Sequence, residues 1–224
     1  MHPAFQLLLC LTLFMLIHIS IMAVCARAFG ITVRSISYGV GSTLLAVGKV
    51  RVRLLPLAGN VVLKDTRAET LYDDDRCLDA YNFQPLWKQV LLPLSGVGVL
   101  LALSLGILEA SGWERFAAAF GQIIHGALAP LSTAQALLGD GERFVRTHGF
   151  APVFALFSLK LCAFNLQPFA GLNGGQALLA TARGGKPYVE WEETATKWLL
   201  LPGLAILLAW AAAFGWYGWK IMAT

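Results

Sequence analysis

Long apolar stretches alternate with shorter polar ones along this chain. Four of the apolar stretches are long enough to cross a lipid bilayer, which takes about 20 apolar residues. They cover residues 4–26, 86–108, 151–169 and 198–217. The pattern therefore predicts a mainly α-helical, polytopic membrane protein with four transmembrane helices.

The segment between the first two expected spans has a different pattern. From Lys49 to Leu54 charged and apolar residues alternate, which is typical of a half-buried strand. Residues 56–60 interrupt this alternation, and Val61 to Leu63 resumes an apolar run. We therefore expect a small membrane-associated β-hairpin or sheet within a β-rich cytoplasmic segment, residues 31–65.

Between the second and third expected spans, residues 116–138 are apolar in patches but are interrupted by polar residues. This pattern favours an amphipathic helix or a re-entrant element. The sequence Gly-Asp-Gly at residues 139–141 is typical of a turn, because glycine readily adopts turn conformations.

The third expected span is unusual because it carries Lys160 and Asn165 and is then broken at Pro168. Polar side chains and helix breakers at membrane depth are tolerated where protein or a cavity buries them. The pattern indicates a functional interior. A structural role, in which Lys160 pairs or snorkels to the interface, explains that residue as well as a functional role does. A purely structural hydrogen bond from Asn165 to a neighbouring helix is the less favoured explanation of the stretch from Asn165 to Asn173.

Composition and charge agree with a membrane protein. The chain is 57% hydrophobic and 13% charged, whereas soluble domains are nearer a quarter charged. Its net charge of +4 does not suggest a nucleic-acid partner. Nine Lys and Arg residues lie between the first two spans, with Lys88 at the start of the second span included, and three lie between the second and third. The positive-inside rule then predicts that the first and third connections are cytoplasmic and that both termini are outside.

Two short frames lie inside the first and third spans. Residues 18–22 read His-Ile-Ser-Ile-Met, and residues 165–168 read Asn-Leu-Gln-Pro, followed by Leu-Asn-Gly-Gly at residues 172–175. Both frames resemble the active-site motifs of the site-2 protease family, the intramembrane zinc metalloproteases. In that family the first frame reads His-Glu-x-x-His, and the second has Asp at the position of Asn173.

The resemblance is not confined to these frames. Residues 30–41, 55–61 and 85–96 resemble further segments of the family in the same order. The chain is therefore identified as a degenerate member of the family, with a single site-2-protease-like membrane domain over residues 1–224. The PDZ domain that many bacterial members carry is not expected, because the segment from Gly112 to Gly149 is too short to hold one.

The resemblance implies that three catalytic positions are replaced. Ile19 stands where the family has its general base, Met22 where it has the second histidine ligand, and Asn173 where it has the carboxylate ligand. A thioether is a poor ligand for zinc beside imidazole, and a neutral amide does not offset the charge of a dication. Only His18 survives as a possible ligand, so we expect no intact catalytic residue and no bound metal.

Two other metal sites were considered. His18, Cys25 and Cys162 could in principle hold an ion, although the seven residues between the first two correspond to about 10 Å along a helix axis. The acidic run Asp73 to Asp75 could gather a cation but is more typical of a solvated loop.

These features favour a pseudoprotease that binds or regulates a transmembrane client, or an active protease relative, and that contacts membrane lipid. In the family a substrate segment docks as an extended strand beside the site. The residues expected to bind the partner are Val50, Val52, Leu54, Asn165, Pro168, Asn173, Gly174 and Gly175.

Two other functions are compatible with the sequence. The first is an intramembrane zinc metalloendopeptidase with a non-standard site, and the second is a small transporter or channel that uses the broken third span. A decayed gene product without a present role is a further possibility. The expected location is the bacterial inner (plasma) membrane.

Overall fold

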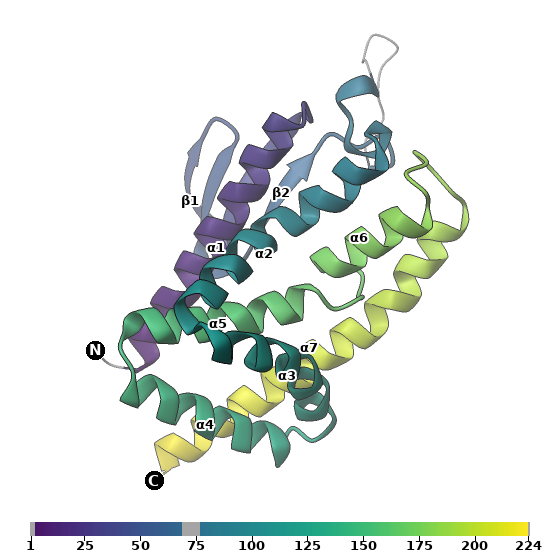
Figure 1. Ribbon diagram of the computed structural model, residues 1–224. Coiled ribbons are helices and arrows are strands. Elements are labelled where there is room, and N and C mark those ends of the chain that lie inside the picture. Colours follow the sequence, from purple (N-terminus) through teal and green to yellow (C-terminus); the bar gives the residue numbers. More distant parts are fainter. Residues whose placement is uncertain (1–2, 69–76, 224) are drawn as a thin grey trace.

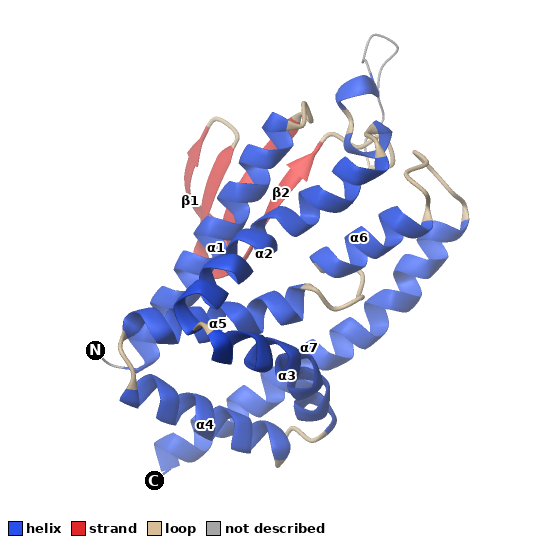
Figure 2. Cartoon of the chain, in the orientation of Figure 1, coloured by secondary structure: helices blue, strands red, loops and turns tan. Residues whose placement is uncertain are grey.

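The computed structural model describes residues 3–68 and 77–223, and these are mainly helical with one small sheet (Figures 1 and 2). The acidic run Asp73 to Asp75, considered above as a cation site, lies outside the described residues. In chain order the elements are α1 (Pro3–Ala28), β1 (Val33–Val47), β2 (Val50–Leu63), the short 3-10 helices η1 (Cys77–Asp79) and η2 (Tyr81–Phe83), α2 (Leu86–Leu108), α3 (Ala110–Leu128), α4 (Thr133–Thr147), α5 (Phe150–Asn165), α6 (Asn173–Ala182) and α7 (Trp191–Ala223).

Three of the described helices, α1, α2 and α7, are long and apolar enough to cross a membrane. The predicted bounds of α2 are confirmed, whereas α7 begins at Trp191 rather than at residue 198. Its first turn contains Glu192 and Glu193, and acidic side chains stabilise a helix N-terminus. Helix α5 has 16 residues and is about 24 Å long, which is shorter than the hydrocarbon core. The predicted count of four spans is therefore not confirmed.

Helices α5 and α6 together connect the two ends of the molecule (Figure 1). Near the start of α5, Val153 packs in a core cluster with Cys10 and Phe14 from the first half of α1. After the end of α6, Arg183 donates a hydrogen bond to Gln89 in the first turns of α2. The chain breaks between the two helices at residues 166–172, so the break predicted at Pro168 is confirmed.

The sheet consists of β1 and β2, which pair antiparallel from Val33↔Leu63 to Val47↔Val50 with several irregularities in register. The hairpin turn lies at Gly48, whose φ is +55°, and β2 continues through residues 56–60. The predicted interruption at those residues is therefore wrong. Irregular register of this kind tolerates a proline, which a regular central ladder excludes.

Gly59 lets the sheet lie directly against α1. A Cβ atom at this position would stand 2.6 Å from the carbonyl oxygen of Ser37 and 3.3 Å from Cγ1 of Ile19. Ile19 belongs to a core cluster with Ile36 of β1 and Leu92 of α2. The sheet, α1 and α2 thus share one apolar core.

The region between α2 and α5 forms two helices, α3 and α4, rather than one amphipathic element. The turn lies between them and contains Pro130, whereas residues 139–141 lie inside α4. The predicted turn at those residues is wrong. Tertiary contacts hold this part of α4 helical, because the next residue, Glu142, accepts hydrogen bonds from Tyr217 of α7 and from Arg146.

Both termini lie at the same end of the molecule, together with α4 and the end of α7 (Figure 1). At the opposite end, Lys88 Nζ at the start of α2 donates to Phe29 O just after α1, at 2.7 Å. The connection from α6 to α7 lies at this second end as well. The connection between α1 and α2 and the connection between α6 and α7, which were predicted to share one side of the membrane, therefore lie at the same end of the molecule.

The shared core gives a first prediction. Replacing Leu92, which is 1% exposed, with Ala should lower the free energy of unfolding by about 2–4 kcal/mol, because a cavity remains between α1, α2 and β1. Denaturant titration of the protein in detergent measures this change. The matched control is Leu207→Ala in α7, where the side chain is 52% exposed and a change within about 0.5 kcal/mol is expected. Equal effects of the two substitutions would contradict the shared core.

Candidate functional site

His18 of α1 and Asn173 of α6 meet in the interior although 155 residues separate them. Asn173 Nδ2 lies 3.0 Å from His18 Nε2, and the two residues are only 7% and 6% exposed. In this orientation the amide donates and the imidazole nitrogen accepts. If the amide were reversed, Nε2 would carry a proton and donate to the amide oxygen. In both arrangements the Nε2 lone pair is not free for a metal.

Glycines allow the three helices to approach closely enough for this contact. A Cβ atom at Gly96 of α2 would collide with His18 Nδ1 and would lie 2.6 Å from His18 O. A side chain at Gly174 would collide with Leu166 O, and one at Gly175 with Phe169 O. Close packing against α2 and against the loop after α5 therefore sets the positions of His18 and Asn173.

Ile19 and Met22, at the positions where the family has its general base and its second histidine, offer no metal ligand of the usual kind. Ile19 is buried in the apolar core, and the side chain of Met22 lies beside the site with only a thioether to offer. Within residues 3–68 and 77–223, no three His, Cys, Asp or Glu side chains form a group that could hold a metal ion. The donor set around His18 therefore does not fit zinc.

The alternative site made of His18, Cys25 and Cys162 is wrong. Cys25 packs against the core cluster that contains Ile19, whereas Cys162 is buried in the separate cluster that contains Phe14. The Cys162 thiol donates to the carbonyl of Val97, with a sulfur–oxygen distance of 3.6 Å. Both cysteines therefore serve the apolar packing.

A cavity of about 360 Å³ begins at His18 and Asn173 and extends between α1, α2, β2 and α6 to the start of α7. Strand β2 lines it with residues 59–61 and Leu63, and α2 lines it with Leu92 and Pro93. Its far end is charged. The cavity therefore joins the His18–Asn173 contact to a polar region near the end of α6.

Among the residues predicted to bind a partner, Asn173 lines this cavity. Val50, Val52 and Leu54 lie in the other half of β2, away from the described lining. Asn165 donates to Leu161 O within α5, and Pro168 is exposed in the loop. The role of these residues in binding stays a prediction, while the stretch of β2 beside the site is residues 59–63.

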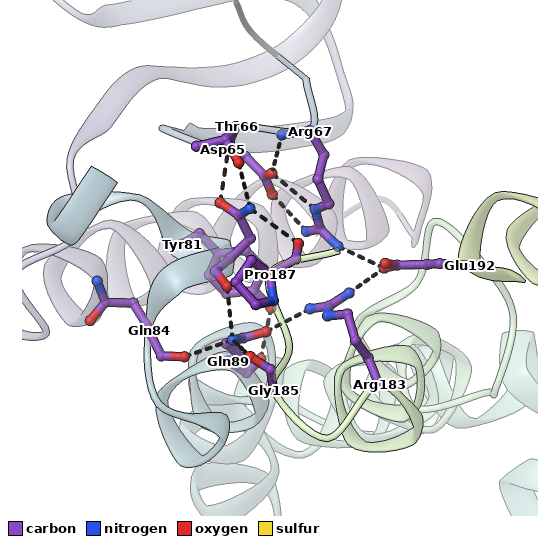
Figure 3. Close-up of polar contacts among 11 residues, drawn as sticks. Asp65, Thr66, Arg67, Tyr81, Gln84, Gln89, Arg183, Gly185, Pro187 and Glu192 are labelled. Atoms are coloured by element: carbon purple, nitrogen blue, oxygen red, sulfur yellow. Dashed lines mark hydrogen bonds and ion pairs between the residues drawn. The ribbon is translucent and has the colours of Figure 1, made fainter. Parts of the chain in front are cut away.

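Four charged residues at the far end of the cavity form a connected network (Figure 3). The Glu192 carboxylate accepts from Arg67 Nη1 at 2.6 Å and also from Arg183 Nη1. Arg183, which is 4% exposed, donates through Nη2 to Gln89 Oε1 at 2.5 Å. Arg67 in turn binds both carboxylate oxygens of Asp65. The network ties α7 to α6, α2 and the segment after β2.

The network fixes the charges of its members. Burial alone would raise the pKa of Asp65, but hydrogen bonds from Arg67 outweigh it and hold this pKa below its usual value. Burial likewise opposes ionisation of Arg67, yet Asp65 and Glu192 raise the pKa of its guanidinium. Burial raises the pKa of Tyr81 to about 12, and its hydroxyl donates to Gln89 O at 2.7 Å. Asp65 is therefore a carboxylate bound to Arg67 and a weak base.

This network could not be recognised in the sequence. Arg67 counted there only among the basic residues between the first two spans, and neither Arg183 nor Glu192 stood out. The available signal was weak: charged residues of opposite sign stand beside apolar runs in two distant regions, residues 65–67 and residues 183–192. Charge pairing between such segments depends on the tertiary fold.

The fold and the site together define a polytopic membrane protein with a buried polar site between helices from both halves of the chain. A family model described as peptidase family M50 matches residues 6–210. The chain belongs to this family, the site-2 protease family, and the resemblance found in the sequence is confirmed. No curated protein matches the chain.

The contact at Gly96 yields a second prediction. Gly96→Ala should lower the free energy of unfolding by about 1–3 kcal/mol, because the new methyl group would push His18 away from Asn173. Thermal unfolding in detergent measures the loss, and the His18 ring signals in NMR should shift. Gly98→Ala is the matched control on the same helix, since no atom lies within 4 Å of its added Cβ. A Gly96→Ala protein as stable as the control would refute this packing.

A third prediction concerns pH. Because the pKa of Asp65 is lowered in the folded protein, its carboxylate contributes stability above the unfolded pKa of about 3.9. That contribution is lost as the pH falls through the folded pKa. Asp65→Asn should therefore cost about 1–3 kcal/mol at pH 7 and should reduce the loss of stability between pH 7 and pH 3. Unfolding titrations at several pH values measure both effects.

The control for this experiment is Asp140→Asn. The side chain of Asp140 is 70% exposed and its ion pair with Arg143 spans 3.7 Å, so little change is expected at either pH. An Asp65→Asn protein with the pH profile of the wild type would show that the network does not hold this carboxylate.

Proposed function

We propose that this protein is a catalytically inactive member of the site-2 protease family that binds the transmembrane segment of another membrane protein. One observation carries the proposal: at the former metal position, the His18 imidazole is hydrogen-bonded to the neutral amide of Asn173. The cavity beside this pair is retained. Binding is therefore favoured over cleavage.

Hydrolysis of a peptide bond needs an activated water, and the described residues around the cavity supply no free base. Ile19 is apolar at the position of the family's general base. Asp65 and Glu192 do line the cavity, but each binds one or two arginine side chains. A carboxylate held in this way is a poor proton acceptor, because protonation would break its ion pairs.

The binding mode follows from β2. Each residue of the 59–63 half of β2 pairs with a single β1 residue, so this half keeps one edge that does not pair with β1, and it is the half that lines the cavity. An extended client segment can add to such an edge through main-chain hydrogen bonds. The wall of Ile19, Leu92 and Val61 suits apolar side chains of a transmembrane segment. The client is either protected from cleavage or presented to an active protease relative.

The membrane arrangement is part of the proposal. We place α5, the loop and α6 together as a fourth crossing, since they connect the two ends of the molecule. The end rich in Lys and Arg faces the cytoplasm of a bacterial inner membrane, and both termini face outward. This orientation puts the charged network near the cytoplasmic surface, where water and headgroups lower the cost of charge.

Photo-crosslinking tests the binding proposal. A photoreactive amino acid at Val61, which lines the cavity, should capture a membrane protein in intact cells. The same residue at Val47, which is 65% exposed at the far tip of the sheet, should not capture it. Mass spectrometry identifies the captured protein. If no membrane protein is crosslinked at either position, client binding is contradicted.

Cleavage is tested on the same captured client. Co-expression with the wild type should leave the client full length, and His18→Ala should not change its pattern on a gel. A client fragment that disappears in the His18→Ala strain would show instead that the protein is an active protease.

A further inference from the structure

A second cavity, of about 390 Å³, lies between α3, α4 and α5. It is separate from the site described above and shares no lining residue with it. Its described lining includes Arg115 and Gln122 of α3, Phe144 of α4, and Leu156 and Lys160 of α5. These helices lie toward the end of the molecule that holds both termini (Figure 1).

Lys160 brings an unneutralised charge to this cavity. Its Nζ donates to Gln122 Oε1 at 2.5 Å, which holds the side chain against α3. An ammonium group has three donors, and the amide oxygen satisfies one of them without cancelling the charge. Within the part of the chain that the structure describes, Lys160 forms no ion pair. A further acceptor at this position would therefore be favourable.

Arg115 adds a second positive charge to the same cavity. Its guanidinium lies over the ring of Phe144, 5.3 Å from the ring centroid, and it too forms no ion pair with any described residue. Its charge acts on Lys160, so the two cations repel one another. Of the two acidic residues of the lining, Glu114 forms no ion pair with any described residue, and Asp140 pairs with Arg143. Glu114, Arg115 and Lys160 are all exposed, so a ligand can reach both cations.

The rest of the wall is apolar. Leu137 and Phe144 of α4 and Leu156 of α5 face the same space. A ligand that satisfies both parts of this cavity carries an anionic head and an apolar body. A planar guanidinium binds two oxygens of a phosphate at once, while an ammonium adds a point charge.

We propose that the cavity between α3, α4 and α5 binds the phosphodiester group of a membrane phospholipid through Lys160 and Arg115. The glycerol and the first acyl carbons then lie against Leu137 and Leu156. Free inorganic phosphate offers the same anionic chemistry, but it would leave the apolar wall uncovered. The site is independent of client binding at the His18 cavity, and either can hold without the other.

Native mass spectrometry of the full-length protein released from detergent tests the proposal. Phosphatidylglycerol should remain bound as one molecule per protein, whereas diacylglycerol with the same acyl chains, which lacks the phosphodiester, should not. Lys160→Met and Arg115→Gln should each weaken retention about tenfold or more, because each removes a charge-assisted contact. The matched control is Lys197→Met on α7, whose side chain is 73% exposed and does not line the cavity, and it should retain the lipid as the wild type does.

Three results would overturn the proposal. The first is a double variant, Lys160→Met with Arg115→Gln, that retains phosphatidylglycerol like the wild type. The second is retention of diacylglycerol equal to that of phosphatidylglycerol. The third is complete displacement of the lipid by inorganic phosphate at millimolar concentration, which would identify the free anion as the ligand. Circular dichroism melts of each variant show that it is folded. Gln122→Leu supplies a further variant that keeps both positive charges. It removes the hydrogen bond that holds Lys160 against α3, so it should weaken lipid retention less than Lys160→Met does.

Discussion

The hydrogen bond between His18 Nε2 and Asn173 Nδ2 joins the first helix of the molecule to the helix that follows the broken third apolar segment. It lies where relatives in the M50 family would place a metal ion, according to the sequence resemblance. An amide and an imidazole satisfy one another there without a cation. A carboxylate in the place of Asn173 would leave a buried negative charge, which is costly unless it is paired. The neutral asparagine avoids that cost.

The walls of the cavity depend on contacts other than this hydrogen bond. Gly96, Gly174 and Gly175 are needed for the close approach of α1, α2 and the loop after α5, whether or not a metal is present. The network around Glu192 holds the start of α7 across the far end of the cavity. The walls of the cavity therefore do not depend on which side chains stand at positions 19, 22 and 173.

Much of the fold could be predicted because it depends on local apolar patterns. Helix α2, the break at Pro168 and the β-rich segment follow from hydropathy and alternation alone. The turns were harder. Residues 139–141 look like a turn locally, but contacts of Glu142 with α7 keep α4 helical. Pro56 is a stronger local signal for a strand break than Gly48. The sequence pattern therefore predicts the break at residues 56–60, whereas the hairpin turn lies earlier, at Gly48.

The residues of the site could be predicted only where they stand at positions of the family's motifs. His18 and Asn173 could be paired on that basis, whereas geometry determines that residues 59–63, and not 50–54, line the cavity. The ion pairs among Asp65, Arg67, Arg183 and Glu192 join segments up to 125 residues apart, and no local pattern specifies such contacts. The two unpaired cations at the second cavity could be found only once α3 and α5 were placed side by side.

Elemental analysis of the purified protein tests the central claim most directly. The wild type should contain far less than one zinc per molecule after dialysis against zinc-containing buffer. The variant Ile19→Glu, Met22→His, Asn173→Asp restores the family's motif on the same backbone and should contain about one zinc per molecule. One tightly held zinc in the wild type, lost in His18→Ala, would contradict the account.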